Sequence, residues 1–583
     1  MVFFKYYCRV KFYGCSILIN AIFMKVLKFL IVLSVMLFIM NTSCTKAPTG
    51  QVFINGTFYT MDDALPEAEA IVVRGNQISY VGDREGAMAF AGKDAEVIDL
   101  QGKWVIPGLT ESHMHFDNLG RNLLRSPLDV YWLSLEDLVE RIAEAAKEAV
   151  PGEWIVARGY NEALWEKTPH RSILDAVSPD NPVVLRRYCG HAHWVDSKAL
   201  EAAGVTKETE NPDAGFIMRD DDGIPTGVLI SAAGPLVTNH IPPVPKLSHD
   251  EELKALKLGS DALLANGITT VHCASQTGME DIELRRQAYE AGMLQVRVMD
   301  ALDVDAAKVL KTPLIGLYDN SYTVRWVKMF IDGSLGGRGA AMMEAYSDMP
   351  NKYGALRELG QNEDAYANLV ADLLQMGFTT RTHSIGDRGN HVTLNAFERA
   401  MEISGKTAEE ARLVVEHAQI LLPDDIKRFG NKNIIASMQP VHATEDMLFV
   451  EDRIGKERAM SAYAWRSIID EGGIIAAGSD YWVSPFNPFY GMHAAVTRQN
   501  RSNKPLNGWF AEQAMTRDEA LKAYTIWPAY VEFSEDIKGS IAKGKLADFV
   551  VIDRDYFNIP AQDIHKIQVL RTVLGGKTVF EVD

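Results

Sequence analysis

The sequence predicts an α/β protein, a (β/α)8 TIM barrel with a small β-sandwich-like domain built from both ends of the chain. Apolar, strand-like runs alternate with helical patterns through the middle of the chain, which is typical of parallel α/β folds. Hairpin-like β patterns occur near both ends, so two half-sheets can meet in one domain. With 583 residues, of which 47% are hydrophobic, the chain is long enough for both parts.

The first 43 residues differ from the rest and predict a signal peptide. Met24-Lys-Val-Leu-Lys28 supplies a short positive region, and residues 29–40 carry no charge but are too few for a comfortable membrane span. We interpret residues 1–23 as an over-long start, because Met24 is a more natural first residue.

Asn41-Thr-Ser-Cys44 resembles the lipobox of bacterial lipoproteins, in which the cysteine is lipidated and becomes the mature N-terminus. We expect lipidation at Cys44, a lipidated linker at 44–50, and an exported, membrane-anchored protein that faces the periplasm or the cell exterior. The alternative is an uncleaved N-terminal anchor, which also places the body outside the cytoplasm. Past Cys44 only Cys189 and Cys273 remain, which excludes a disulfide framework.

Residues 51–105 and 541–583 are expected to form a composite small β domain. The first part alternates β-rich runs with turn signals, as in Val52-Phe-Ile-Asn-Gly56 and in residues 70–81. The same pattern returns in Ala547-Asp-Phe-Val-Val-Ile552.

Residues 106–540 are predicted to form the barrel. Eight apolar runs can supply its strands: Trp104 to Leu109, Ile268 to Cys273, Gln295 to Asp300, Val324 to Ile331, Phe378 to His383, Leu413 to His417, Ile434 to Met438 and Ile474 to Asp480. The segment at about 116–250 then becomes an insertion after the first strand, with enough helix and strand signals for a lid or subdomain.

Six polar residues fall at or near the C-terminal ends of these runs, where the catalytic groups of TIM barrels gather: His113, His115, Lys328, His383, His417 and Asp480. The first two histidines stand two positions apart, and alternate residues of a strand point to one face, so both imidazoles can bind one cation. Two nearby histidines are as often surface or hydrogen-bonded core residues. The order of the other four residues favours a metal site.

Longer motifs around these positions resemble the amidohydrolase superfamily, in the branch that includes N-substituted formamide deformylase. The motifs are Val327-Lys-Met-Phe-Ile-Asp-Gly-Ser-Leu335, Thr382-His-Ser-Ile-Gly-Asp-Arg388, Glu416-His-Ala-Gln419, Ser437-Met-Gln-Pro-Val-His442, Gly478-Ser-Asp-Tyr-Trp-Val-Ser-Pro485 and Gly539-Ser-Ile-Ala-Lys-Gly-Lys-Leu-Ala-Asp548. They occur in order, and the resemblance extends from residue 51 onward.

The resemblance implies that His113, His115, His383, His417 and Asp480 hold one or two divalent metal ions, with zinc expected. Neutral imidazoles suit several transition metals, and histidines with a carboxylate leave room for water, unlike a closed structural zinc site. Asp480 is also the expected catalytic residue, which takes a proton from the attacking water and returns it to the leaving nitrogen.

Lys328 needs a separate explanation, because a protonated amine cannot bind a cation. The superfamily answers this with a lysine that has reacted with carbon dioxide, so the resemblance implies a carboxylated Lys328 that bridges two metal ions. An ion pair with a nearby carboxylate and a Schiff-base lysine are the alternatives.

Four further residues are candidate substrate contacts: His442 and Asp446 after the seventh strand, and His191 and His193 in the insertion. Hydrogen-bonded structural roles are the alternative for each. Asp196 stands where this branch commonly has asparagine, and we expect the difference to affect substrate recognition because of its closeness to the histidines of the insertion.

The leading interpretation is a metal-dependent amidohydrolase that cleaves an N-formyl, N-acyl or related amide by a metal-activated hydroxide. A cyclic-amide hydrolase, a deaminase and a non-catalytic binding lipoprotein are the alternatives. The expected partners are a small amide-like substrate and the membrane, and a homo-oligomer is compatible with the sequence. A formal net charge of −18 argues against nucleic acid binding.

Overall fold

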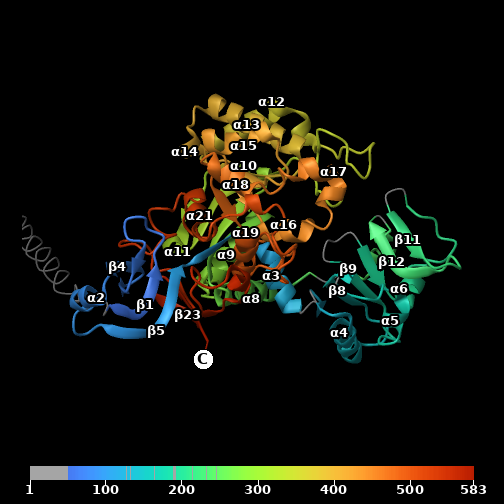
Figure 1. Cartoon of the computed structure of the whole chain (residues 1–583), viewed down its shortest axis with the longest axis horizontal. Helices are drawn as coiled ribbons and strands as arrows, with labels where there is room; N and C mark the ends of the chain where they lie inside the picture. Colours follow the sequence, from blue (N-terminus) through green and yellow to red (C-terminus); the bar gives the residue numbers. More distant parts are fainter. Residues whose placement is uncertain are drawn as a thin grey trace, which may run out of the picture.

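The computed structural model describes residues 50–582 except 126–127, 132, 163–164, 188–191, 213–214, 232 and 244–245. The predicted signal peptide, Cys44 and His191 lie outside the described residues. Within the described part, no helix combines the length and the apolar character needed to cross a membrane. In Figure 1 the small β domain lies at the left, the barrel in the centre and the insertion at the right.

Eight parallel strands form the barrel, and the predicted fold class is confirmed. In sheet order they are β20 (Ile475–Ala477), β19 (Ile435–Met438), β18 (Val414–His417), β17 (Thr379–Ser384), β16 (Tyr322–Phe330), β14 (Arg297–Leu302), β13 (Ile268–Thr277) and β6 (Leu109–Met114). Nearly all of their side chains are buried. This follows from the architecture, in which helices cover the outside and side chains fill the inside.

The helices that follow the strands form the outer layer. They include α8 (His249–Ala265), α9 (Met279–Glu290), α10 (Val304–Leu310), α12 (Glu363–Gln375), α13 (Asp387–Ser404), α15 (Pro423–Asn431), α18 (Trp465–Asp470) and α21 (Ile526–Val531). The start of α8 shows why such a helix begins where it does: Ser248 and Glu251 form a reciprocal capping box.

The end of the first strand meets the segment that follows the last strand. Met114 forms a parallel bridge with Tyr481. The Asp480 N–H donates to the His113 carbonyl at 2.7 Å, and the His115 N–H donates to the Tyr481 carbonyl at 2.8 Å. The barrel therefore closes at the place where three of the predicted site residues lie.

The first barrel strand begins later than expected. Trp104 to Pro107 belong to β5 (Glu96–Pro107) of the small domain, and β6 begins at Leu109. Gly108 separates the two strands, and a Cβ atom there would lie 2.3 Å from Thr269 Oγ1. Because the apolar run continues across this glycine, hydrophobicity alone cannot show that the chain passes from one sheet into another.

Both ends of the chain contribute strands to the small domain. Its sheet has the order β23 (Lys577–Glu581), β22 (Val569–Leu574), β21 (Phe549–Ile552), β5, β1 (Gln51–Tyr59), β3 (Ala70–Arg74) and β4 (Gln77–Gly82), and β2 (Glu67–Ala68) pairs with β1. Antiparallel pairing of β21 with β5 places Val550 opposite Ile106. The C-terminal strands thus join the strand that leads into the barrel.

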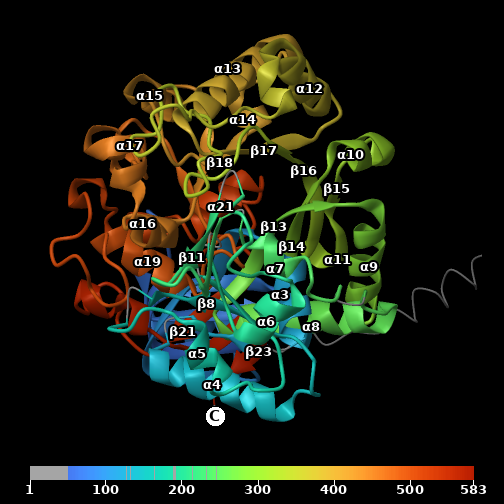
Figure 2. The same ribbon diagram turned by 90° about the vertical axis from the view of Figure 1, so that its right-hand side faces the viewer.

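The insertion forms a sheet of its own between α3 (Phe116–Arg125) and α8. The strand order is β11 (Gly215–Arg219), β12 (Pro225–Ser231), β10 (Ala192–Val195), β9 (Val183–Arg187), β8 (Ile155–Tyr160) and β7 (Leu128–Asp129). Its helices include α4 (Leu135–Glu148), α5 (Arg171–Asp175) and α6 (Ser197–Ala202). Figure 2 shows this unit in front of the barrel.

A buried ionic network joins the barrel to the segment that returns to the small domain. Glu532, just after α21, accepts a hydrogen bond from His272 of β13 at 2.6 Å and contacts the Lys538 ammonium group. Lys538 Nζ also donates to Thr270 Oγ1 at 3.0 Å. All four residues are buried. Removing the cation would leave a buried carboxylate without its partner.

We therefore expect Lys538→Met to lower the free energy of unfolding by about 3 kcal/mol. Denaturant unfolding followed by fluorescence measures this change. Lys566→Met is the matched control, because Lys566 contacts Asp563 on the surface, where an ion pair contributes about 1 kcal/mol or less. Equal losses in the two variants would contradict the special role of the buried network.

Candidate active site

A cavity of about 320 Å³ lies at the C-terminal ends of the barrel strands. The six polar residues predicted from the strand ends all line it: His113 and His115 at the end of β6, Lys328 in β16, His383 in β17, His417 in β18 and Asp480 after β20. Active sites of TIM barrels lie at this face. The fold thus brings together side chains that the sequence places far apart.

His113, His115 and Asp480 form one candidate metal group. Their ligand atoms all lie within 4.8 Å of one another. Asp480 Oδ1 is 3.6 Å from His113 Nε2 and 3.4 Å from His115 Nε2. Burial opposes ionisation of Asp480, but contact with His115 and the nearby imidazoles hold the pKa of this carboxyl well below its usual range.

His417, His442 and Asp480 form a second group whose ligand atoms also lie within 4.8 Å of one another. His442 belongs to α16 (Pro440–Asp446), which follows β19. The ring centres of His383 and His417 are 4.6 Å apart. Asp480 belongs to both groups, so the arrangement is compatible with one ion or with two.

The donor atoms at this site fit a divalent transition-metal ion. Nε2 of His383, Nε2 of His442 and Oδ1 of Asp480 are buried and have no hydrogen-bond partner. Buried polar atoms normally have one. Imidazole nitrogens with a carboxylate oxygen are the ligands that zinc and related ions prefer.

The imidazoles have the charge state that metal binding requires. Burial lowers the pKa of His113 to about 3 and that of His417 to about 4, and it lowers the pKa of His383 well below the ordinary value. These rings are therefore neutral at pH 7, which is the form that binds a metal. His417 Nδ1 lies 2.8 Å from Gln439 Oε1 and donates to it, which leaves Nε2 for a ligand.

Glu416 and Arg381 orient His113 from inside the barrel, where both are fully buried. The Glu416 carboxylate contacts His113 Nδ1 with one oxygen and Arg381 Nε with the other. Burial by itself would raise the pKa of Glu416, but Arg381 and then His113 hold it well below its usual range. Glu416 thus accepts the Nδ1 proton of His113 and leaves Nε2 directed toward the cavity.

Lys328 is buried at the wall of the cavity. Its Nζ lies 5.2 Å from the centre of the Phe330 ring and makes no ion pair with any described carboxylate. Burial lowers the pKa of this amine, although Glu416 and Asp480 oppose the shift. The geometry therefore gives no support to the alternative of a structural ion pair.

Of the candidate substrate contacts, Asp446 lies in the cavity and His193 lies in the insertion. Asp446 lines the cavity, where its carboxylate accepts hydrogen bonds from the Tyr463 hydroxyl at 2.5 Å and from Gln419 Nε2 at 2.9 Å. His193 lies in β10 against Gly234 and is not among the described residues that line the cavity. A substrate contact by His193 stays a prediction without support from this geometry.

Asp196 has structural contacts inside the insertion, and the expected effect on substrate recognition stays a prediction. Its Oδ1 accepts the N–H of Ala199 at 2.8 Å, which caps α6, and the N–H of Val183 at 2.9 Å. The carboxylate thus joins a helix end to β9 inside the insertion.

Apolar side chains form much of the cavity wall: Phe330, Leu335, Ile385, Phe449, Trp482 and Val483. The insertion reaches this wall at Trp482. The guanidinium carbon of Arg158 lies 4.8 Å from the Trp482 ring centre, and the Tyr131 hydroxyl donates to the Trp482 carbonyl at 3.3 Å. The insertion therefore supports one side of the cavity.

Sequence reasoning missed the buried residues that hold the ligands in place. Arg381 is one of them, Glu416 in its role toward His113 is another, and Glu111 is a third. Glu111 Oε1 accepts the N–H of Ser479 at 2.8 Å and that of His113 at 3.1 Å. Glu111 joins the first strand to the last at the site. A signal was present, because charged residues are rare inside strands that are otherwise apolar.

Comparisons with known proteins identify the family. The profile of the Amidohydrolase family matches residues 96–580. Protein LONG AFTER FAR-RED 3 of Arabidopsis thaliana is 33% identical over 545 residues, which are 90% of this chain and 91% of the relative. N-substituted formamide deformylase of Arthrobacter pascens is 28% identical over 554 residues, which are 91% of this chain and 98% of the relative.

A comparison with solved structures agrees with this family. The crystal structure of an uncharacterized metal-dependent hydrolase from Pyrococcus furiosus superposes with a TM-score of 0.65 at 26% identity, and the match covers 87% of this chain and 100% of that one. Since the family profile spans the barrel, the cavity and the strands β5 and β21 to β23 of the small domain, this chain belongs to the amidohydrolase family.

Proposed function

We propose that the protein is a metal-dependent hydrolase that cleaves the C–N bond of a small, non-peptide amide. The observation that carries this proposal is the buried carboxylate of Asp480, which two candidate metal groups share within one cavity and whose Oδ1 has no hydrogen-bond partner. Family membership supports hydrolysis, and similarity to N-substituted formamide deformylase supports a C–N bond. A cyclic amide would use the same donor atoms.

His113, His115, His383, His417 and Asp480 would hold one or two divalent ions, with zinc the expected metal. When bound, such an ion lowers the pKa of water and polarises a carbonyl group. A carboxylated Lys328 would add two further oxygen ligands. Burial favours the neutral Lys328 amine, which forms an N–C bond to carbon dioxide and releases one proton.

Asp480 would transfer the proton. Its lowered pKa keeps the carboxylate ionised at neutral pH, so Oδ1 can accept the proton of the attacking water. The same oxygen can return this proton to the nitrogen as the C–N bond breaks. The second step matters because an unprotonated amide nitrogen is a poor leaving group.

The cavity lining favours a neutral amide with an apolar substituent. The wall is largely apolar, and Lys328 is the only lysine or arginine among the described residues that line it. Glu445 and Asp446 lie on the same lining. Once Lys328 is carboxylated, no lysine or arginine of the described lining is left to pair with a free carboxylate on the substrate. N-formyl or N-acyl amides of apolar amines therefore fit better than N-acyl amino acids.

We further propose that the enzyme is exported and anchored to the membrane through lipidated Cys44, as the N-terminal sequence predicts.

The metal-loaded protein should release amine from N-formyl and N-acyl amides of apolar amines, and Asp480→Asn should lower kcat by about 100- to 10,000-fold. Asparagine cannot take the proton of water but keeps the shape of the side chain. Amine release and metal content are measured together in both proteins. Asp470→Asn, which removes an exposed carboxylate beside Arg466, is the control.

Near-normal turnover by Asp480→Asn would remove the aspartate from this role. If the metal-loaded wild type hydrolysed no N-formyl amine, N-acyl amino acid, cyclic amide or carbamate, a binding protein would be the better interpretation.

Carboxylation of Lys328 predicts a carbamate carbon signal in the NMR spectrum of the metal-loaded protein equilibrated with isotopically labelled bicarbonate. Lys328→Met should lose this signal and bind fewer metal ions, because the bridging oxygens are gone. Lys545→Met, which removes another partly buried lysine, should keep both. A fully metal-loaded wild type without the signal would show that the amine is not carboxylated.

Glu416→Gln should weaken metal affinity by about 10- to 100-fold, because an amide orients the His113 ring less strongly and makes it a weaker ligand. Competition with a chelator measures the affinity. Glu398→Gln, which alters a contact with Arg428 on the outside of the barrel, should leave it unchanged. Equal affinities in all three proteins would restrict Glu416 to a role in folding.

A further inference from the structure

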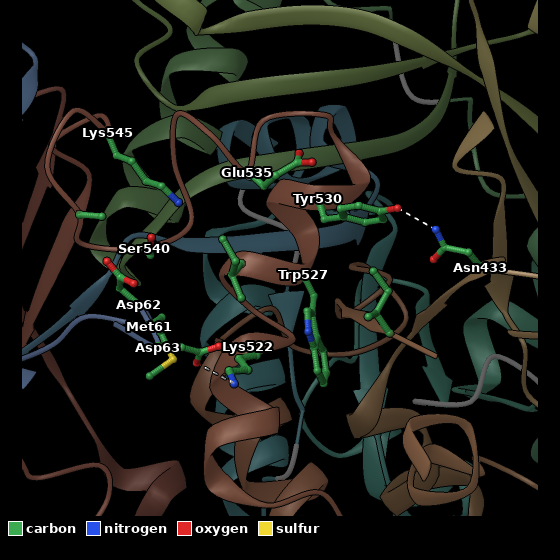
Figure 3. A pocket seen from close by; sticks show the side chains of 13 residues that line it. Met61, Asp62, Asp63, Asn433, Lys522, Trp527, Tyr530, Glu535, Ser540 and Lys545 are labelled. Carbon is green, nitrogen blue, oxygen red and sulfur yellow. Dashed lines mark hydrogen bonds and ion pairs between the residues drawn. The ribbon is translucent and has the colours of Figure 1, made fainter. Parts of the chain in front are cut away.

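Figure 3 shows the residues that line a second cavity, of about 610 Å³. This cavity lies at the opposite end of the barrel from the candidate active site. Asn433 and Ile474 line it and come just before β19 and β20, so it lies at the N-terminal ends of these strands. Other lining residues come from α21, the end of α20 (Arg517–Lys522) and the small domain. The two cavities share no described lining residue.

One side of this second cavity is apolar and aromatic. Figure 3 shows Trp527 on one side and Lys545, Ser540 and Asp62 on the other. Met61, Ile474 and Ile526 add apolar surface. Small-molecule sites are typically about 300–1,000 Å³ in volume and combine apolar walls with a few convergent polar groups.

Three of the five charged residues that line the cavity are satisfied by ion pairs. Glu535 is 2.7 Å from Arg412. Lys522 is 2.9 Å from Asp518 and 3.7 Å from Asp63. These charges have no need of a ligand.

Asp62 and Lys545 are the two others, and neither has an ion-pair partner among the described residues. Lys545 Nζ donates to the Lys538 carbonyl at 3.3 Å, which uses one of its three N–H groups. Asp62 Oδ1 accepts the N–H of Ala64 at 3.1 Å. Burial lowers the pKa of Lys545, and Asp62 is the nearby carboxylate that opposes this shift most. A partly buried ammonium group and a carboxylate therefore border the same cavity without being paired.

We propose that this cavity binds an α-amino acid with a large apolar side chain, whose carboxylate contacts Lys545, whose ammonium group contacts Asp62 and whose side chain packs on Trp527. The balance of unpaired charges selects this class. A simple anion would meet Asp62, and a simple cation would meet Lys545, whereas a zwitterion satisfies both. This site is separate from the proposed catalysis and does not depend on it.

Isothermal titration calorimetry of the full, metal-loaded protein with L-phenylalanine tests the proposal. L-Phenylalanine should bind, while 3-phenylpropionate, which lacks the ammonium group, and 2-phenylethylamine, which lacks the carboxylate, should each bind about tenfold more weakly or worse. Failure of L-phenylalanine to bind, or equal binding of the three compounds, would overturn the proposal.

Variants locate the binding site. Lys545→Met and Asp62→Asn should each weaken L-phenylalanine binding by about tenfold or more, and Lys545→Arg should restore most of the affinity because it keeps the charge. Lys543→Met, two residues away on the exposed surface, is the matched control and should bind like the wild type. Circular dichroism and melting temperature establish that each variant is folded. Full affinity in both Lys545→Met and Asp62→Asn would contradict the assignment.

Asp480→Asn separates this site from the active site. It should bind L-phenylalanine as the wild type does, whatever its effect on hydrolysis. Loss of binding in Asp480→Asn would place the amino acid in the catalytic cavity and overturn the proposal.

Discussion

The buried contact of Glu416 with Arg381 and His113 is the interaction on which the candidate site depends. Both charged groups are buried away from water. Burying either one without its partner would cost several kcal/mol of folding free energy, so the two are stable there only as a pair. The guanidinium carbon of Arg381 lies 4.6 Å from the centre of the Trp326 ring, and Trp326 belongs to an apolar cluster built from five barrel strands. The direction of the His113 ring is therefore set by the packed interior of the barrel, which is more rigid than a loop.

A second constraint acts at the closure of the barrel. Asp480 and His417 have positive backbone φ angles of 54° and 74°, a conformation that residues other than glycine rarely adopt. Such strain costs about 1–3 kcal/mol and persists only where the surroundings enforce it. For Asp480 the hydrogen bonds between the end of β6 and the segment after β20 do so. The carboxylate thus reaches the histidines because the first and last strands meet there.

The apolar cluster that contains Trp326 also separates the two cavities. Ile474 and Tyr530 pack against it and line the cavity at the N-terminal ends of the strands, while Arg381 lies over Trp326 on the way to the catalytic face. One end of the barrel holds imidazoles and a carboxylate suited to a metal, and the other holds an aromatic ring with two unpaired charges. A closed barrel can present different chemistry at its two ends because its packed interior keeps water and side chains from passing between them.

The sequence by itself determined the barrel, the composite β domain and the polar residues at the strand ends, because these follow from local periodicity and from motifs around single positions. The passage from β5 to β6 across Gly108, and the contact of Arg381 and Glu416 with His113, were decided only by the tertiary structure. So was the nearness of Asp62 to Lys545. Local patterns record which face a side chain occupies, whereas contacts between distant segments depend on how strands and domains close on one another in three dimensions.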